Sequence, residues 1–271
     1  MAVTALSGQR WQGSSTATLT PTYTPEYIAD DWVIEGSTTY HSIDVGVEID
    51  FKCMRSTSPI RGISYDFGST LSDTALVCRF QLDLDTIYSN SGGGIYEVFS
   101  LNTTDSSVAE AGSNTYFGLA IQHSNTENYF FAVHGVGVSN HSNQTEIGSD
   151  MLATGTWYVE MIRLTSTSFS VRVTSSSDYT GGTIVTVTGL SASVDDLQYF
   201  TSKTSGGSSI DNYIQGSFKG VKVWNGVTSS TQDDKTTVTD VPVGSEFEQT
   251  NDYKSYQAGS LNNGTATGAT L

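Results

Sequence analysis

Positive charge is scarce in this sequence. Its 271 residues include 12 Lys and Arg against 28 Asp and Glu, which gives a formal net charge of −16 at pH 7. A surface of that charge repels phosphate backbones, so the composition argues against nucleic-acid binding. The excess of carboxylates fits plain solubility or a salty medium, and it leaves a cation-dependent site open.

Proline, cysteine and long hydrophobic runs are also scarce. No apolar stretch is long enough to cross a membrane, so membrane insertion is not expected. The first residues, MAVTALSGQRWQGSS, lack a basic start followed by an apolar run, and no secretory signal is expected. No long segment shows helical periodicity, which leaves strands as the expected elements.

The two cysteines, Cys53 and Cys78, both occupy apolar positions of expected strands. They could be neighbours that form a disulfide, or two buried thiols that act as small hydrophobic side chains. Their spacing matches no cysteine-based metal site.

The stretch TWYVEMIRLTSTSFSVRVT, residues 156–174, predicts a β-hairpin. Alternate residues from Trp157 to Met161 share one face of its first strand, and alternate residues from Phe169 to Val173 share one face of its second. Successive side chains of a strand point to opposite faces, so this alternation is typical of half-buried antiparallel strands. Similar patterns recur at 39–54, 61–67, 75–84, 95–101, 115–123, 128–136, 183–188, 197–201 and 210–224. Together they predict an all-β fold, a two-sheet antiparallel jelly-roll sandwich.

Three segments are expected: an irregular N-terminal arm at 1–38, the sandwich at 39–227, and a linker with a short β or irregular C-terminal extension at 228–271. The arm has too many aromatic residues for a disordered tail, so it is expected to pack on the sandwich or on a partner chain. The candidate assembly residues are Trp11, Tyr23, Tyr27 and Trp32 in the arm, and Phe247, Tyr253 and Tyr256 in the extension.

The hairpin stretch GTWYVEMIRLTSTSFSVRV and the closing strand GSFKGVKVWNG resemble the concanavalin A-like lectin/glucanase family, which is laminin-G-like. The resemblance covers residues 39–227. It implies two curved antiparallel sheets, and often a glycan-binding or docking role for the concave face or the rim loops.

The segment VPVGSEFEQTNDYKSY, residues 241–256, is similar to a short motif of tail-fibre and other virion proteins. The acidic position of that motif is displaced to Asp252, and its usual downstream Asp-Gly-x-x-x-Trp is absent. The matching residues are Pro242, Gly244, Phe247, Thr250, Lys254 and Tyr256.

Glu48 and Asp50 resemble the start of the Glu-x-Asp-x-x-Glu strand of the glucanase branch of this fold. Retaining glycosidases need two carboxyl groups about 5–5.5 Å apart, one as nucleophile and one as acid. Cys53 stands where the second Glu would be, so no catalytic residue is assigned and the chain is expected not to be an enzyme.

Polar loops supply the candidate glycan-binding residues, although an ordinary solvated loop has the same composition. These candidates are His123, Asn125, Asn128, His141 and Asn143. No histidine pattern supports a transition-metal site, and no cofactor is expected. Calcium is left open, because oxygen ligands without EF-hand spacing are present at Asp30, Asp31, Asp83, Asp85 and Asp150.

These observations lead to one functional hypothesis. The chain is expected to be a non-enzymatic virion structural protein, either a capsid decoration, a spike or a fibre subunit, that presents a lectin-like sandwich to host-surface glycan. Its expected partners are other capsid or tail proteins and further copies of itself, and its expected place is the virion surface after synthesis in the host cytoplasm. The alternatives are a free carbohydrate-binding or adhesion module of a marine-type microbe and a divergent glycoside hydrolase.

Overall fold

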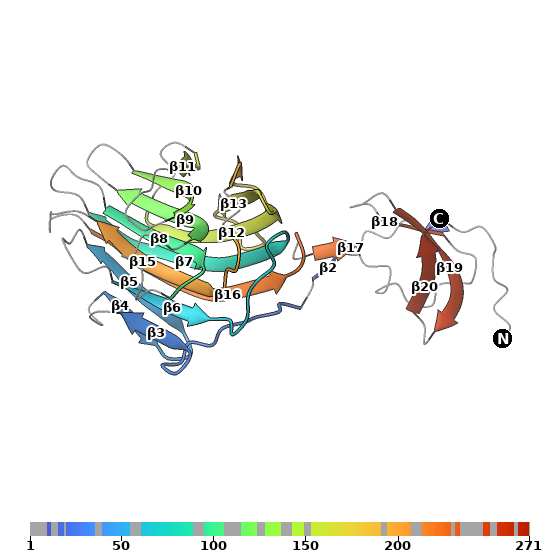
Figure 1. Cartoon of the computed structure of the whole chain (residues 1–271), viewed down its shortest axis with the longest axis horizontal. Helices are drawn as coiled ribbons and strands as arrows, with labels where there is room; N and C mark the ends of the chain where they lie inside the picture. Colours follow the sequence, from blue (N-terminus) through green and yellow to red (C-terminus); the bar gives the residue numbers. More distant parts are fainter. Residues whose placement is uncertain are drawn as a thin grey trace. The chain divides into compact units, whose positions relative to one another are not determined.

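Strands are the regular elements of the described chain (Figure 1). None of the described residues forms a helix that could cross a membrane. The computed structural model describes residues 10–11, 16–18, 20–35, 40–54, 61–88, 95–105, 115–123, 128–136, 143–148, 153–190, 194–206, 213–228, 231–233, 246–249, 254–262 and 265–270.

The chain divides into two units. The larger unit is Pro21–Thr228, and the smaller one joins Met1–Thr20 to Ser229–Leu271. The larger unit therefore includes residues 21–38, which the sequence analysis placed in the arm. The reason is strand β3 (Trp32–Glu35), which pairs with β6 (Arg61–Asp66) inside the sandwich.

Two seven-stranded sheets form the larger unit, and every pair of neighbouring strands in them is antiparallel. This confirms the predicted two-sheet sandwich. Sheet one has the order β11 (Asn143–Glu146), β10 (Asn128–Val136), β9 (Thr115–His123), β8 (Ile95–Asn102), β15 (Tyr199–Gly206), β6 and β3. Sheet two has the order β14 (Thr183–Thr188), β13 (Ser168–Thr174), β12 (Gly155–Thr165), β7 (Leu76–Tyr88), β16 (Tyr213–Asn225), β5 (Glu48–Met54) and β4 (His41–Asp44).

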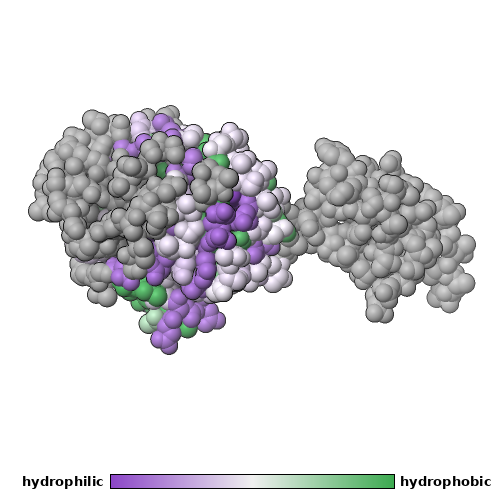
Figure 2. Space-filling view, in the orientation of Figure 1, coloured by the Kyte–Doolittle hydropathy of each residue, from purple (hydrophilic) through white to green (hydrophobic). Residues whose placement is uncertain are grey.

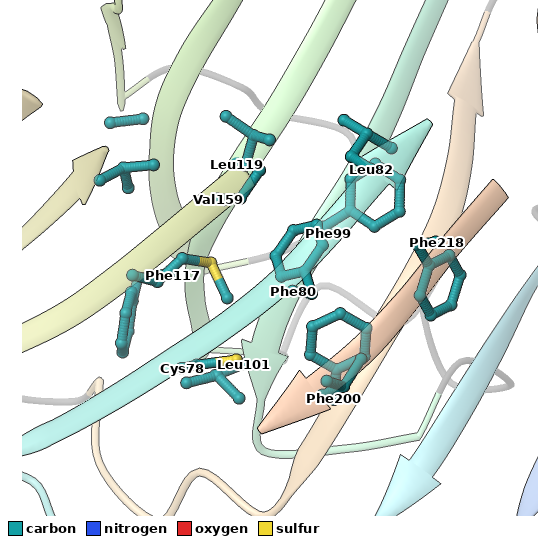
Figure 3. Packing of buried hydrophobic residues seen from close by; sticks show 14 of the residues in the cluster. Cys78, Phe80, Leu82, Phe99, Leu101, Phe117, Leu119, Val159, Phe200 and Phe218 are labelled. Carbon is teal, nitrogen blue, oxygen red and sulfur yellow. The ribbon is translucent and has the colours of Figure 1, made fainter. Parts of the chain in front are cut away.

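The core lies between the facing sides of the two sheets. The predicted hairpin is β12 paired with β13, and its alternate residues Val159 and Met161 are fully buried. Figure 3 shows phenylalanine rings from both sheets meeting in this core. Phe80 of sheet two lies 5.4 Å from Phe99 and 5.5 Å from Phe200 of sheet one, measured between ring centroids.

Residues 21–35 pack on the sandwich, which is one of the two places that the sequence analysis left open for this segment. Trp32 is only 3% exposed, and its ring is stacked with Tyr27 at 6.2 Å. The ring of Tyr23 lies 5.0 Å from Phe67, and its backbone pairs with Val223 of β16. Trp32 is therefore a residue of the core, and Tyr23 and Tyr27 pack against the edge of the core.

Cys53 and Cys78 are both buried, and neither forms a disulfide. The Cα partner of Cys53 on β16 is Ile214, whereas that of Cys78 is Val223. The two cysteines therefore lie near opposite ends of β16, about 30 Å apart at the usual rise per strand residue. The structure therefore agrees with two buried thiols that act as small hydrophobic side chains, and not with a disulfide between them.

Both ends of the chain contribute strands to the smaller unit. Its four-stranded sheet has the order β1 (Arg10–Trp11), β18 (Glu246–Gln249), β19 (Lys254–Asn262) and β20 (Thr265–Thr270), and β2 (Thr16–Thr18) pairs with β17 (Thr231–Asp233). In this sheet Phe247 is the Cα partner of both Trp11 and Tyr256. Three of the predicted assembly residues thus share one register row, and Tyr253 lies outside the described residues.

Candidate functional site

A β-bulge at Asp85 interrupts sheet two. Gln215 of β16 pairs with Thr86 of β7, but the next residue, Gly216, pairs with Leu84. Asp85 is therefore an extra residue with no Cα partner on β16. Bulges bend a strand locally and change the direction of a side chain, and the Asp85 side chain here is exposed.

Two adjoining depressions, of about 420 and 400 Å³, share Asp85 on the outer face of sheet two. We call this surface the Asp85 groove. Its walls carry hydroxyl and amide groups, and it contains more carboxylates than amines. The hydrogen-bonding side chains that line it are Tyr40, Ser42, Glu48, Asp50, Lys52, Gln81, Asp83, Thr156, Gln215, Ser217 and Lys219.

One end of the Asp85 groove is an ion cluster. The Lys219 Nζ atom lies 3.1 Å from Glu48 Oε2 and 3.0 Å from Asp83 Oδ2. Partial burial raises the pKa of Asp83, but hydrogen bonds from Thr156, Lys219 and Gln81 outweigh burial and hold the pKa below its usual value. Hydrogen bonds to Asp83 and Glu48 raise the pKa of Lys219. This cluster is therefore charged on both sides at neutral pH.

The ion cluster bears on the resemblance of Glu48 to a glucanase nucleophile. Two carboxylates that each lie about 3 Å from one nitrogen are within about 6 Å of each other, close to the separation in retaining glycosidases. A glycosidase needs one of its two carboxyl groups protonated. The lowered pKa keeps Asp83 ionised, and the Lys219 ammonium occupies the space between the pair. Asp83 is therefore not suited to act as the acid of such a pair.

At the middle of the groove, the Asp85 carboxylate has no hydrogen-bond or ionic partner in the described part of the chain. Asp50, by comparison, accepts a hydrogen bond of 3.0 Å from the Ser42 hydroxyl. Asp85 is thus an uncommitted acceptor at the point where the two depressions meet.

Tyrosine rings flank the other end of the groove. Tyr88 and Tyr213 are stacked at 5.3 Å, and Tyr88 is 44% exposed. The Lys52 ammonium, which lines the groove, lies 4.8 Å from the centre of the Tyr213 ring. Figure 2 shows that the described surface of the sandwich is mostly hydrophilic on the side in view, with small hydrophobic patches. Exposed Tyr88 and half-buried Tyr213 therefore place an aromatic surface beside the polar groove.

Several polar side chains on the outer face of sheet one are buried. Lys203 is 2% exposed and its Nζ atom has no hydrogen-bond partner, and burial lowers its pKa to about 8. Tyr116 is 3% exposed with an unpartnered hydroxyl, and burial raises its pKa to about 12. Nearby, the hydroxyls of Ser100 and Thr201 are 2.8 Å apart. Sequence alternation placed these residues on strands but gave no sign that polar groups would be buried on an outer face.

The core also contains a Ser–His–Glu grouping, which resembles a hydrolase triad in composition only. The Ser202 hydroxyl donates a 2.6 Å hydrogen bond to Glu97, and His41 Nε2 lies 3.3 Å from Ser202 and 3.4 Å from Glu97. In a triad the histidine accepts the serine proton, whereas here the carboxylate does. All three side chains are almost fully buried, so a substrate has no access to the hydroxyl. This grouping joins β4 of sheet two to β8 and β15 of sheet one.

The predicted loop site is divided by the structure. Asn128 is the Cα partner of His123 at one end of β10, whereas Asn143 is the partner of His134 near the other end. At the usual rise these positions are about 20 Å apart. The described residues therefore do not bring His123, Asn128 and Asn143 into one site. Two predicted residues, Asn125 and His141, lie outside the described residues.

The aspartates considered for calcium are separated as well. Asp83 and Asp85 line the groove on β7, whereas Asp30 and Asp31 precede β3. Within the described ranges, no three His, Cys, Asp or Glu side chains meet in a way that could hold a metal ion. Asp150 lies outside those ranges.

Solved structures identify the fold. A structure reported for endo-acting O-glycanases of human gut microbiota that initiate mucin breakdown has a TM-score of 0.51 and 7% identity, covering 76% of this chain and 99% of that chain. The sandwich has the concanavalin A-like jelly-roll fold. Other similar structures are alginate lyase A1-II′ (TM-score 0.46, 10% identity, 71% of this chain and 86% of that chain) and peanut lectin (TM-score 0.45, 13% identity, 74% and 95%). No protein-family model and no curated protein matches this chain.

Proposed function

We propose that the sandwich binds a neutral glycan in the Asp85 groove and does not cleave it. The observation that carries the proposal is the uncommitted Asp85 carboxylate at the bulge, where two polar depressions meet. Carboxylates accept strong hydrogen bonds from hydroxyl groups, and neighbouring amides and hydroxyls can complete a ring of contacts. The Tyr88–Tyr213 pair adds an apolar surface for the C–H face of a sugar ring.

Charge defines the class of glycan. Four carboxylates, at Glu48, Asp50, Asp83 and Asp85, line the groove against two lysines. An acidic sugar would meet like charge there, which costs free energy. We therefore expect neutral sugars to bind, and we expect uronic acids and sulfated sugars to bind more weakly.

The same ion cluster supports binding without hydrolysis. Lys219 holds both Glu48 and Asp83, and the lowered pKa of Asp83 removes the acid that glycoside cleavage requires. Solved structures that are similar to this sandwich include lectins as well as lyases and hydrolases, so the fold alone does not decide between binding and cleavage.

A glycan array followed by calorimetry on the full chain tests the proposal, with Asp85→Ala as the variant and exposed Asp30→Ala as the matched control. Loss of one hydrogen bond to a charged group costs about 1.5–3 kcal/mol, so Asp85→Ala should weaken binding about 10- to 100-fold. Asp30→Ala should bind like the wild type. Equal binding by Asp85→Ala, or release of reducing sugar that disappears in Glu48→Gln, would overturn the proposal.

We also propose that this chain is a virion surface protein, such as a capsid decoration, spike or fibre subunit, of which the sandwich is one part. Two observations support this role: residues 241–256 are similar to a motif of virion appendage proteins, and the two ends of the chain form a unit separate from the sandwich. That unit, with Trp11, Phe247 and Tyr256 in one register row, is the proposed contact with capsid or tail proteins. Deleting residues 229–271 should prevent incorporation into particles, and normal incorporation of this variant would contradict the role.

A further inference from the structure

A second tyrosine pair stands on the outer face of sheet two, near the ion-cluster end of the Asp85 groove. The ring centroids of Tyr158 and Tyr179 are 5.6 Å apart, and the two rings meet edge to face. Tyr158 of β12 is the Cα partner of Gln81, which lines the groove. It also shares a face of β12 with Thr156, another lining residue, because alternate residues of a strand point the same way. The groove therefore has a tyrosine pair near each of its two ends.

Core packing does not explain the position of these two rings. Tyr158 and Tyr179 are both half-buried, and neither belongs to a hydrophobic core cluster of the described residues. Tyr179 lies in the loop between β13 and β14, where its backbone has a φ of 62°. This left-handed conformation is unfavourable for a residue with a Cβ atom, and such conformations are concentrated at ligand-binding and catalytic sites. The loop therefore positions the Tyr179 ring at a cost to its own backbone.

Both the backbone and the ring of Tyr179 are held in place. Arg172 of β13 donates a 3.2 Å hydrogen bond from Nη1 to the Tyr179 carbonyl oxygen. On either side of that carbonyl, the Asp178 carboxylate accepts a 2.9 Å hydrogen bond from the Thr180 N–H group. The Arg79 guanidinium lies 4.4 Å from the centre of the Tyr179 ring. A ring that is already fixed loses little conformational entropy when a ligand packs on it.

We infer that the ligand-binding surface continues from the Asp85 groove to the Tyr158–Tyr179 pair, and that it binds an internal stretch of an extended neutral polysaccharide. The inference rests on the proposed glycan binding and adds the length and the shape of the ligand. On β7, Tyr88 follows Gln81 by seven positions, which is about 23 Å at the usual rise per strand residue. This distance is longer than a disaccharide, so a short sugar cannot contact both tyrosine pairs.

The groove follows the direction of its strands, which determines the shape of the ligand. Gln81, Asp83 and Asp85 line it in sequence along β7, and Gln215 and Ser217 line it along β16. Groups that bind hydroxyls are therefore spaced along the whole distance between the tyrosine pairs. A sugar chain with β-1,4 linkages is extended and fits such a row, whereas an α-1,4-linked chain coils away from it. The ligand is therefore a β-1,4-linked glucan, mannan or xylan.

Calorimetry on the full chain tests the length of the ligand. The probes are β-1,4-linked gluco-, manno- and xylo-oligosaccharides, each as a disaccharide and a hexasaccharide. One hexasaccharide should bind about 10-fold more tightly than its disaccharide, because only the longer chain contacts both tyrosine pairs. Asp85→Ala should weaken the binding of both lengths, since Asp85 lies at the middle of the groove.

Two variants test the second tyrosine pair itself. Tyr158→Ala and Tyr179→Gly should each weaken hexasaccharide binding about 2- to 10-fold and leave disaccharide binding unchanged. Glycine suits the left-handed backbone at position 179, so Tyr179→Gly removes the ring and keeps the loop. The matched control is Tyr199→Ala, at a half-buried tyrosine on β15 of sheet one, which should bind both lengths like the wild type.

The outcomes separate this inference from the proposed glycan binding. Equal affinity for both lengths, or hexasaccharide binding that Tyr158→Ala and Tyr179→Gly leave unchanged, would overturn the inference, while a loss in Asp85→Ala would still support binding in the groove. Array binding of other glycans without any of these probes would also overturn it. A loss in Tyr199→Ala as large as in Tyr158→Ala would place the ligand on sheet one and overturn both. Urea unfolding of each variant completes the test, because lower stability without a selective loss of hexasaccharide binding would give Tyr179 a structural role alone.

Discussion

Gly216 on β16 lies directly against Asp83 on β7, so closely that a Cβ atom at Gly216 would overlap the Asp83 carbonyl oxygen. This contact stands next to the bulge, because Gly216 pairs with Leu84 and skips Asp85. A glycine at position 216 is therefore what allows β16 to approach β7 beside Asp85, where the two depressions of the groove meet.

Gly216→Ala should destabilise the sandwich by about 1–3 kcal/mol, since the added methyl group must push β16 away from β7. It should also weaken glycan binding, because the bulge that positions Asp85 has to shift. Urea unfolding followed by calorimetry measures both effects. The neighbouring change Gln215→Ala, at an exposed side chain, should leave stability within about 0.5 kcal/mol of the wild type. Equal stability of the two variants would show that β16 adjusts without cost.

Glu160 on β12 lies between two arginines of neighbouring strands. It accepts a 2.7 Å hydrogen bond from Arg79 Nε, and its other oxygen is 3.5 Å from Arg172 Nε. The Glu160 side chain is 6% exposed, so Glu160→Gln leaves two partly exposed guanidinium groups without a counter-charge and should cost about 1.5–3 kcal/mol. Arg172→Met should cost less, because Arg79 still neutralises Glu160. Chemical denaturation of both variants checks this order, and a larger loss in Arg172→Met would contradict it.

The alternation of apolar residues was sufficient to predict the strands of the sandwich, because a half-buried strand repeats every second residue. It placed Val159 and Met161 in the core correctly. It could not place Trp32, since a four-residue edge strand is too short to show a period. It could not separate Cys53 from Cys78 either, because the distance between them depends on the register of each strand against β16.

The site was harder to predict than the fold for a related reason. Asp83 and Asp85 look equivalent in the sequence LDLD, and alternation assigns both to the outer face. Only the pairing of β16 shows that Asp85 stands at a bulge and that Lys219 binds Asp83. Long-range pairing also divided the predicted loop site, by placing Asn128 and Asn143 toward opposite ends of β10.

A chain of residues 21–228 alone should fold with the melting temperature of the sandwich in the full chain. The reason is that the core and both seven-stranded sheets lie within Pro21–Thr228. Starting the chain at residue 39 instead should destabilise it strongly, because Trp32 would be lost from a buried position, and losses of this kind cost about 3–5 kcal/mol. Differential scanning calorimetry of the two fragments makes the comparison. Equal melting temperatures of the two fragments would show that the sandwich begins at residue 39, as the sequence analysis predicts.

Lys203 should make the stability of the sandwich increase with pH. Burial lowers its pKa to about 8 in the folded chain, whereas an unfolded lysine titrates near pH 10.4. Between these values the unfolded chain holds a proton that the folded chain has released, so the free energy of unfolding rises through this window. Below about pH 8 both states are protonated, and the folded state carries the full cost of a buried ammonium group that has no hydrogen-bond partner.

Lys203→Met should remove that rise and stabilise the sandwich at pH 7 by about 1–3 kcal/mol, because a methionine side chain of similar length needs no partner. Urea unfolding at a series of pH values, compared between wild type and variant, isolates the contribution of Lys203, since tyrosines that titrate near pH 10 affect both proteins equally. Exposed Lys222→Met serves as the control and should follow the wild-type curve. A wild-type curve that stays parallel to that of Lys203→Met from pH 7 to pH 10 would mean that the ammonium is neutralised or hydrated in the folded chain.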